Sequence, residues 1–295
     1  MIKQTLMFTN PVSLSLKDNQ LVITFKDNKD TVTRPIEDIG FVIIENPQVS
    51  ISVPLLNELA DNNVSVMFCD KKQMPRTMLM TLEGNTTQQE SYKYQIEASV
   101  PTKKNVWKQL VESKIKNQAL LLNSLGKNGD SLKPFYLNVK SGDTDNREGA
   151  AAREYWSQIF DEGFRREREG APPNILLNYG YTILRAAVAR ALVGSGLYPA
   201  FGVFHRNRYN AFPLADDVME PYRPFVDEIV YHLYYDGAVT ELNNDSKGKL
   251  LRVLFADVKM GKVTRPLENA LSLTTASLLK VFKGDTDKLS LPVLT

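Results

Sequence analysis

One segment of the sequence concentrates residue types that are found at metal sites. His205, one of only two histidines, precedes the carboxylates Asp217 and Glu220 in the stretch H-R-N-R-Y-N-A-F-P-L-A-D-D-V-M-E-P-Y-R-P at 205–224. If this segment is helical, a spacing of three residues places both carboxylates on one face. A histidine with carboxylates suits a divalent cation such as Mn²⁺ or Mg²⁺, whereas a structural zinc site more often needs several cysteines.

A site made of these three residues lacks a ligand, so we expect another carboxylate. Glu148 is the best candidate, because the small residues 149–152 follow it and would let a phosphate backbone or another helix come close. Gly149 is expected either to permit such an approach or to stand at the start of a helix. Asp216 is interpreted as a solvated surface carboxylate.

The composition is that of a folded soluble protein and excludes some classes of site. The chain has 295 residues, of which 43% are hydrophobic and 24% charged, and a formal net charge of +2. A nucleic-acid partner would therefore need a local basic surface. Cys69 is the only cysteine, which excludes an intrachain disulfide and a cysteine zinc cluster.

The sequence favours a cytoplasmic protein without a membrane segment. No apolar run of signal-peptide length stands at its start, and the most apolar region, residues 175–204, is interrupted by Arg185 and Arg190.

The apolar patterns predict an α+β protein of two domains. Residues 1–82 read as a small β-rich domain of hairpins and buried strands, with one short helix at 52–61. Residues 83–101 are polar and are interpreted as a linker. Residues 102–295 are predicted to form an all-helical domain, with a short β excursion as the alternative at 260–264, and the chain from Gly284 onward is interpreted as a fraying tail. The strongest helical patterns are at 106–125, from 147 onward, at 174–192, 225–235 and 267–282.

Four ordered blocks in the helical part carry a family resemblance. They are E-G-A-A-A-R-E-Y-W at 148–156, N-I-L-L-N-Y-G-Y at 174–181, G-L-Y-P-A-F-G-V-F-H at 196–205 and L-A-D-D-V-M-E-P-Y-R-P at 214–224. These blocks resemble the signatures of the CRISPR-associated spacer-acquisition integrase, the first of the numbered Cas proteins. The segment T-K-K-N-V-W-K-Q-L-V-E-S-K-I-K-N-Q at 102–118 resembles the form that accompanies type II systems.

The resemblance implies a catalytic domain in which Glu148, His205 and Glu220 surround Mg²⁺ or Mn²⁺. Asp217 supports them, either by binding the metal directly or by contacting one of its ligands. His205 is either a ligand alone or also a general acid or base. The β domain is expected to mediate dimer contacts and to supply no metal ligand.

The implied activity is a metal-dependent DNA endonuclease and integrase of CRISPR adaptation. It joins the 3′-hydroxyl ends of a prespacer to the repeat of a CRISPR array by transesterification. The implied partners are double-stranded DNA, a second copy of the chain, a dimer of the small second Cas protein and, as an open alternative, the RNA-guided effector nuclease. The arginines near the blocks are candidates to neutralise DNA phosphates. They are Arg165, Arg166, Arg168, Arg206, Arg208 and Arg223.

Two other functions compete with this reading. In one, the acidic cluster is structural and the chain is a non-catalytic DNA-binding subunit of a nucleoprotein assembly. In the other, the chain is a metal hydrolase for small phosphorylated molecules. That hydrolase would need a phosphate-cradling loop, and G-S-G at 194–196 lacks the Walker lysine.

Overall fold

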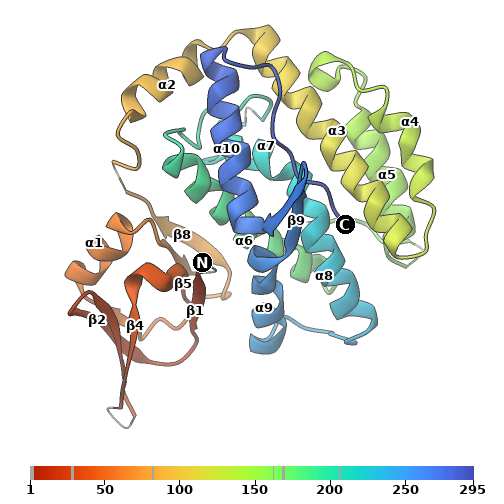
Figure 1. Cartoon of the computed structure of the whole chain (residues 1–295). Coiled ribbons are helices and arrows are strands. Elements are labelled where there is room, and N and C mark those ends of the chain that lie inside the picture. Colours follow the sequence, from red (N-terminus) through yellow and green to blue (C-terminus); the bar gives the residue numbers. More distant parts are fainter. Residues whose placement is uncertain (1–2, 28–29, 82, 162, 168–169, 206) are drawn as a thin grey trace. The chain divides into compact units, whose positions relative to one another are not determined.

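The computed structural model describes residues 3–27, 30–81, 83–161, 163–167, 170–205 and 207–295. They form two compact units, Met1–Gly84 and Asn85–Thr295. The first unit is rich in strands and the second is mainly helical (Figure 1), which confirms the predicted α+β class with the β-rich part first.

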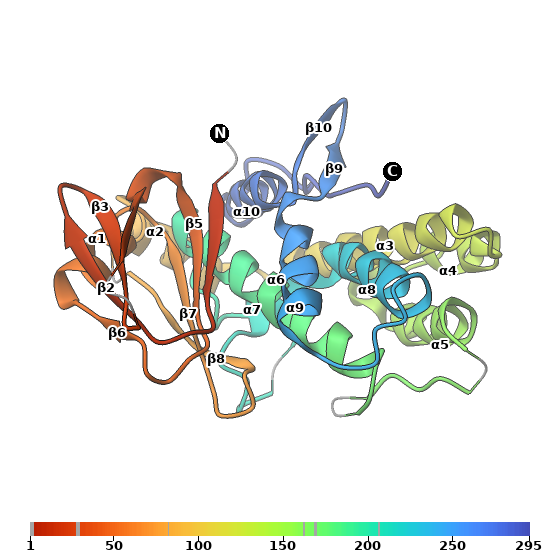
Figure 2. The same cartoon turned by 90° about the horizontal axis from the view of Figure 1, so that it is seen from below.

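Two four-stranded sheets build the β-rich unit, in the orders β1-β5-β7-β8 and β4-β3-β2-β6 (Figure 2). All six residues of β5 are buried, because β1 and β7 pair with it in parallel on both sides. The predicted hairpin is formed by β2 and β3, which are joined at Asp18 and Asn19; both have positive φ angles. The strands are β1 (Gln4–Phe8), β2 (Val12–Lys17), β3 (Gln20–Phe25), β4 (Thr31–Pro35), β5 (Ile39–Ile44), β6 (Ser50–Ile51), β7 (Ser65–Cys69) and β8 (Pro75–Leu79).

One helix, α1 (Val53–Asp61), connects the cores of the two sheets, since it contacts both β2 and β7. Pro54 lies in its first turn, where a missing backbone N–H costs nothing. Leu55 and Leu59, four residues apart, are fully buried in the same apolar cluster as Val42. Burial of a leucine side chain contributes roughly 2 kcal/mol, so these two residues anchor the helix.

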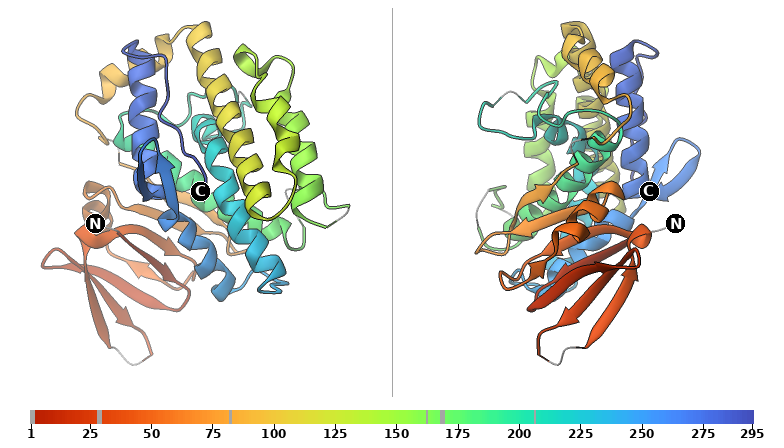
Figure 3. Two further views of the ribbon diagram at one scale, coloured as in Figure 1. Left: turned by 45° about the vertical axis from the view of Figure 1, so that its right-hand side comes forward. Right: turned by 90° about the vertical axis from the view of Figure 1, so that its left-hand side faces the viewer.

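The helical unit is organised around α3, a 25-residue helix that contacts α5, α8 and η4 (Figure 3). Its N-cap is Ser99, whose hydroxyl accepts a hydrogen bond from the Thr102 N–H at 3.2 Å. The elements of this unit are α2 (Gln88–Glu97), α3 (Val100–Ser124), η2 (Gly129–Leu132), α4 (Lys133–Tyr136), η3 (Ser141–Asp143), α5 (Arg147–Ile159), α6 (Asn174–Gly194), α7 (Pro213–Met219), η4 (Glu220–Tyr222), α8 (Arg223–Tyr235), α9 (Asn244–Leu251), η5 (Arg252–Phe255), β9 (Asp257–Met260), β10 (Val263–Pro266) and α10 (Leu267–Lys283). Among the described helices, none combines the length and apolarity needed to cross a membrane.

Two parts of the predicted domain organisation are wrong. Residues 83–101, interpreted as a linker, contain the ten-residue helix α2. Its buried residues are Ser91 and Gln95, so the helix packs through polar side chains and shows no apolar stripe in the sequence. The domain predicted to be all helical also contains an antiparallel strand pair, β9 and β10, at the place where the β excursion was the alternative.

The C-terminal segment is not the predicted fraying tail. The side-chain amide of Asn117 in α3 donates hydrogen bonds to the carbonyls of Pro292 at 3.1 Å and Pro221 at 2.8 Å. Its oxygen accepts a bond from the Leu294 N–H at 3.1 Å. One buried asparagine therefore ties the end of the chain to α3 and to the residue that follows Glu220.

Candidate active site

Glu148 is held in the first turn of α5 by two acceptors that cap this helix. The Asp143 carboxylate accepts hydrogen bonds from the N–H groups of Arg147 at 2.8 Å and Glu148 at 3.1 Å, and Asn146 accepts one from Gly149 at 3.1 Å. A Cβ on Gly149 would lie 2.7 Å from the Asn146 side-chain oxygen, so the cap needs a glycine here. Gly149 therefore stands at the start of a helix, as predicted, and the group that comes close to it is the capping side chain of Asn146.

Glu220 lies in η4 and is 5% exposed. Arg223 Nε donates a hydrogen bond to its Oε1 at 2.9 Å, and Lys114 Nζ lies 2.5 Å from its Oε2. Among the described residues, the buried Oε2 accepts no hydrogen bond and is held by the ion pair with Lys114. Burial opposes ionisation of Glu220, but the charges of Arg223 and Lys114 outweigh it and lower its pKa to about 2.

Lys114 joins the two glutamates. Its ammonium group contacts Glu148 Oε1 as well as Glu220 Oε2, and its side chain is only 9% exposed. Burial disfavours the charged form of Lys114, but the charges of Glu220 and Glu148 outweigh burial and raise its pKa. Two carboxylates from different helices therefore converge on one buried cationic atom.

Asp217 positions His205 and the loop before it. The fully buried carboxylate accepts hydrogen bonds from the backbone N–H groups of Val203 at 2.7 Å, Phe204 at 3.1 Å and His205 at 3.1 Å. His205 Nδ1 lies 2.6 Å from Asp217 Oδ1, and this hydrogen bond raises the pKa of His205. Both Asp217 oxygens are thus occupied by donors, and the bond at Nδ1 leaves Nε2 as the ring nitrogen available for chemistry.

The loop that carries His205 also depends on Gly202. A Cβ at this position would lie 2.6 Å from the His205 carbonyl oxygen and 3.0 Å from Asp217 Oδ2. A larger residue would push the loop away from the carboxylate that orients it. On its other side, the His205 ring packs edge-on against Trp107 of α3, with ring centroids 5.7 Å apart.

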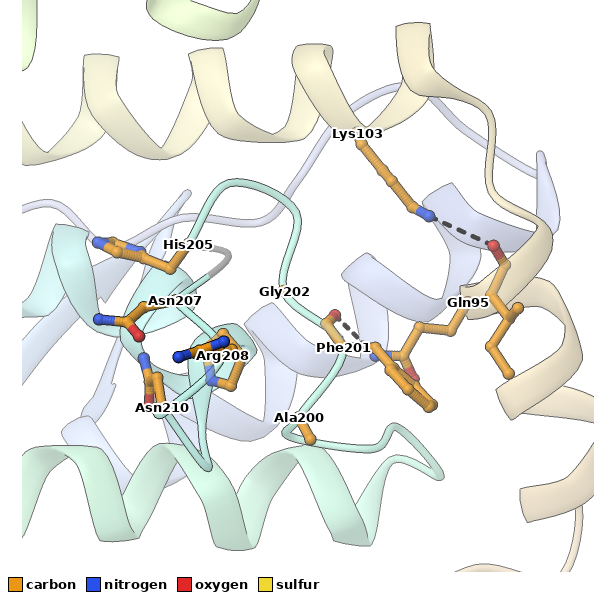
Figure 4. A pocket seen from close by; sticks show the side chains of 11 residues that line it. Gln95, Lys103, Ala200, Phe201, Gly202, His205, Asn207, Arg208 and Asn210 are labelled. Atoms are coloured by element: carbon orange, nitrogen blue, oxygen red, sulfur yellow. Dashed lines mark hydrogen bonds between the residues drawn. The ribbon is translucent and has the colours of Figure 1, made fainter.

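A pocket of about 500 Å³ opens beside His205 (Figure 4). Asn207, Arg208 and Asn210 line it on the side of the histidine, and Gln95 of α2 lines the opposite side. Gln95 donates hydrogen bonds to the carbonyls of Tyr198 at 2.9 Å and Phe201 at 3.2 Å, so α2 fixes this wall. Polar side chains therefore line two sides of the pocket, next to apolar ones such as Phe201 and Pro213, and His205 borders it.

The structure brings Glu148 and Glu220 together, but in the described part of the chain no three histidine, cysteine, aspartate or glutamate side chains are placed to hold a metal ion. Lys114 stands between the two glutamates. Their hard oxygens, including the one without a hydrogen-bond donor, are compatible with Mg²⁺ or Mn²⁺ at the position of the ammonium group. The predicted ligand set of Glu148, His205 and Glu220 stays a prediction.

The candidate arginines differ in what they contact. Arg166 donates to Asn178 Oδ1 at 2.6 Å and Arg223 binds Glu220, so both take part in the structure of the unit. Arg165 and Arg208 are exposed. Arg168 and Arg206 lie outside the described residues. Arg208 donates to the hydroxyl of the exposed Tyr209 and lies over its ring at 4.6 Å, which leaves it at the surface. Exposed arginines can pair with phosphates at little cost in burial, so Arg165 and Arg208 are the stronger candidates for DNA contacts.

A buried network behind Glu220 fixes Arg223. The guanidinium group lies over the ring of Tyr181 at 4.5 Å, and the hydroxyl of Tyr181 donates to Asp227. Tyr155 of α5 donates to the same carboxylate at 2.8 Å. Burial raises the pKa of Asp227 to about 6, although both hydroxyl groups favour its charged form. The network connects α5, α6 and α8, which carry or flank the site residues.

Two residues of the site, Lys114 and Gly202, were not predicted from the four sequence blocks. Lys114 lies with Leu110 and Gln118 on the buried face of α3. A lysine on such a face is the available signal, because lysine is almost never fully buried unless it is paired. For Gly202, the sequence offers no signal beyond its closeness to His205.

Acid is expected to weaken the contribution of Glu220 to stability. Its pKa is lower in the folded protein than in the unfolded chain, so the contribution, about 3 kcal/mol, is present above pH 4.5 and is lost as the pH falls towards 2. We expect the difference in free energy of unfolding between wild type and Glu220→Gln to shrink by about 2 kcal/mol from pH 7 to pH 3. Urea unfolding followed by the fluorescence of Trp107 and Trp156 measures this difference.

The exposed Glu97 supplies the control for this measurement. Glu97→Gln makes the same chemical change without removing a buried ion pair, so its free energy of unfolding should stay close to that of wild type at both pH values. A difference for Glu220→Gln that does not depend on pH would contradict the assigned role of Arg223 and Lys114.

Comparison with known proteins assigns the chain to a family. Residues 6–268 match the family described as CRISPR associated protein Cas1. The CRISPR-associated endonuclease Cas1 of Neisseria meningitidis serogroup C (strain 8013) is 38% identical over 260 residues, which cover 87% of this chain and 84% of the relative.

Two solved structures share the fold. A casposase bound to integration product aligns with a TM-score of 0.81 at 20% identity, covering 98% of this chain and 93% of the other. A Cas6-RT-Cas1–Cas2 complex aligns with a TM-score of 0.74 at 19% identity, covering 99% of this chain and 36% of the other. The family match includes all four blocks, and the identity to the Neisseria relative extends over most of the sequence, so the chain belongs to the CRISPR-associated Cas1 family.

Proposed function

We propose that the chain is a divalent-metal-dependent DNA integrase and endonuclease of CRISPR adaptation, which joins the 3′-hydroxyl ends of a prespacer to a CRISPR repeat. The observation that carries the proposal is the convergence of Glu148 and Glu220 on one buried cationic position. The name endonuclease of the Neisseria relative and the integration product in the casposase structure support it.

The reaction needs no nucleotide cofactor. The 3′ oxygen of the prespacer attacks a phosphorus atom of the repeat, one phosphodiester bond forms, one breaks, and the leaving 3′ oxygen takes up a proton. Glu148 and Glu220 would hold Mg²⁺ or Mn²⁺, which when bound stabilises negative charge on the attacked phosphate. The protein's own contribution is to fix both carboxylates through the cap of α5 and through Arg223.

His205 would act through Nε2, because Asp217 occupies Nδ1. In one arrangement Nε2 binds the cation, and in the other it moves a proton to or from a reacting oxygen. In both, Asp217 is a positioning residue. It sets the tautomer and the direction of the ring from a fully buried position.

The substrate is proposed to be double-stranded DNA, held in part by Arg165 and Arg208 and by polar side chains of the pocket beside His205. The Cas1–Cas2 complex among the similar folds supports the small second Cas protein as a partner. We propose that it binds as a dimer and that this chain binds it as a homodimer. The RNA-guided effector nuclease is a further candidate partner.

The wild-type protein should join a labelled DNA duplex with 3′-hydroxyl ends to a plasmid that contains the repeat. Joining is expected with Mn²⁺ or Mg²⁺ and should be lost when the cation is chelated, because neither carboxylate can then stabilise the phosphate charge through it. A duplex with 3′-deoxy ends is the control, since it lacks the attacking oxygen. Joining at the same rate in the presence of a chelator, or with the 3′-deoxy duplex, would overturn the proposal.

A further inference from the structure

We propose that Lys114 is the resident counter-cation of this site: its ammonium group holds Glu148 and Glu220 together in the metal-free protein and leaves their shared position when a divalent cation binds. The inference rests on the proposed metal site and adds to it a residue that lies outside all four sequence blocks. In this role Lys114 is a positioning residue that competes with the metal.

The geometry allows one cation at the shared position. Lys114 Nζ lies 2.5 Å from Glu220 Oε2 and also contacts Glu148 Oε1. Mg²⁺ bound to a carboxylate oxygen lies about 2.0–2.1 Å from it, so a metal ion that takes both oxygens would fall where the ammonium group now lies. The two cations therefore exclude each other.

Charge explains why a cation is needed there without metal. Glu148 and Glu220 bring two negative charges to a largely buried position, and Arg223 and Lys114 bring two positive charges. Arg223 is fixed by its bond to Glu220 and by the ring of Tyr181. Without Lys114, no described ion pair would connect Glu148 to Glu220, and the two carboxylates would repel each other.

Lys114 can leave without a change in the helix that carries it. Its backbone belongs to the middle of α3, between the buried Val111 and Asn117. The ammonium group is attached through a flexible four-carbon stem, which can move while α3 stays in place. A metal ion can therefore replace the Lys114 ammonium group, whereas Arg223 is held by both Glu220 and Tyr181.

The inference is tested by measuring metal affinity and metal-free stability of the full chain. Lys114→Met removes the charge and keeps an apolar side chain of similar length. We expect Mn²⁺, titrated into the metal-free protein in a calorimeter, to bind this variant with a dissociation constant at least about ten-fold lower than that of wild type. Its metal-free melting temperature should be at least about 5 °C lower, and Mn²⁺ should restore most of that loss.

Two further variants control for charge and for helix position. Lys116→Met removes a positive charge from the exposed side of the same helix, and both measurements should stay near the wild-type values. Lys114→Arg keeps the charge, so its dissociation constant should remain within about three-fold of wild type. If Lys114→Met does not fold, Lys114→Gln repeats the test with a neutral side chain that can still donate hydrogen bonds.

The outcomes separate this inference from the proposed function. Equal or weaker Mn²⁺ binding by Lys114→Met overturns the role of Lys114. In that case, weaker Mn²⁺ binding by Glu220→Gln than by wild type would still support the proposed metal site. If neither wild type nor Lys114→Met binds Mn²⁺, the metal site and the role of Lys114 both fall. Tighter binding by Lys114→Met together with a lower metal-free melting temperature supports both.

Discussion

Replacing Glu148 by glutamine is expected to lower the rate of DNA joining by roughly 10³-fold at saturating Mn²⁺. Glutamine keeps the shape of the side chain and an oxygen that Lys114 can contact, but it removes one of two negative charges directed at the shared position. Stabilisation of a phosphate by a bound cation amounts to several kcal/mol, and about 4 kcal/mol corresponds to a factor of 10³. Initial rates with a labelled 3′-hydroxyl duplex and a repeat-containing plasmid measure the effect.

Glu154→Gln is the matched control for this substitution. Glu154 belongs to the same helix, and it accepts a hydrogen bond from Gln158 Nε2 at 2.8 Å, which a glutamine oxygen can also accept. Its joining rate should stay within about three-fold of wild type. The Glu148 side chain is 29% exposed and glutamine keeps an oxygen for Lys114, so Glu148→Gln should still fold. A rate for Glu148→Gln within ten-fold of wild type would contradict its place in the metal site.

The division of the chain into β-rich and helical parts could be predicted because the apolar period changes along it. Residues 41–44 are a continuous apolar run, and they lie in a strand buried on both faces. The stripe around Val106 and Leu110 predicted α3. Helix α2 could not be predicted in this way, since its buried Ser91 and Gln95 are polar and its stability comes from tertiary contacts.

The sequence predicted which residues belong to the site, but not the contacts between them. Glu148 and Glu220 stand 72 positions apart in the sequence, and only the packing of α3 against α5 and η4 shows that one lysine reaches both. From the sequence, Asp217 could either bind the metal directly or support the residues that bind it. The structure shows both of its oxygens accepting hydrogen bonds from the loop at 203–205. Such acceptor geometry depends on backbone direction, which residue types and spacing do not determine.

The conservative substitution Asp217→Asn is expected to reduce the joining rate by roughly 10²-fold and the free energy of unfolding by about 2–4 kcal/mol. An asparagine has one oxygen, whereas the carboxylate accepts on both of its oxygens. The amide nitrogen that replaces the other oxygen cannot accept a hydrogen bond. It would face either the N–H groups of Val203 and Phe204 or the two donors of His205. Asp217 is fully buried, so water cannot replace the lost bonds, and the loop should shift together with His205.

The titration of His205 distinguishes this explanation from a general loss of stability. Since the hydrogen bond to Asp217 raises the pKa of His205, the pKa in folded Asp217→Asn should fall below the wild-type value. The chain has only one other histidine, His232, so two imidazole resonances can be followed by NMR, with His232 as the internal reference. Asp216→Asn, a change at the neighbouring carboxylate, removes only a smaller charge contribution to the His205 pKa, so it should lower that pKa less than Asp217→Asn does and leave the joining rate close to wild type. An unchanged His205 pKa in Asp217→Asn would show that this carboxylate does not control the histidine, and the positioning role assigned to Asp217 would then be wrong.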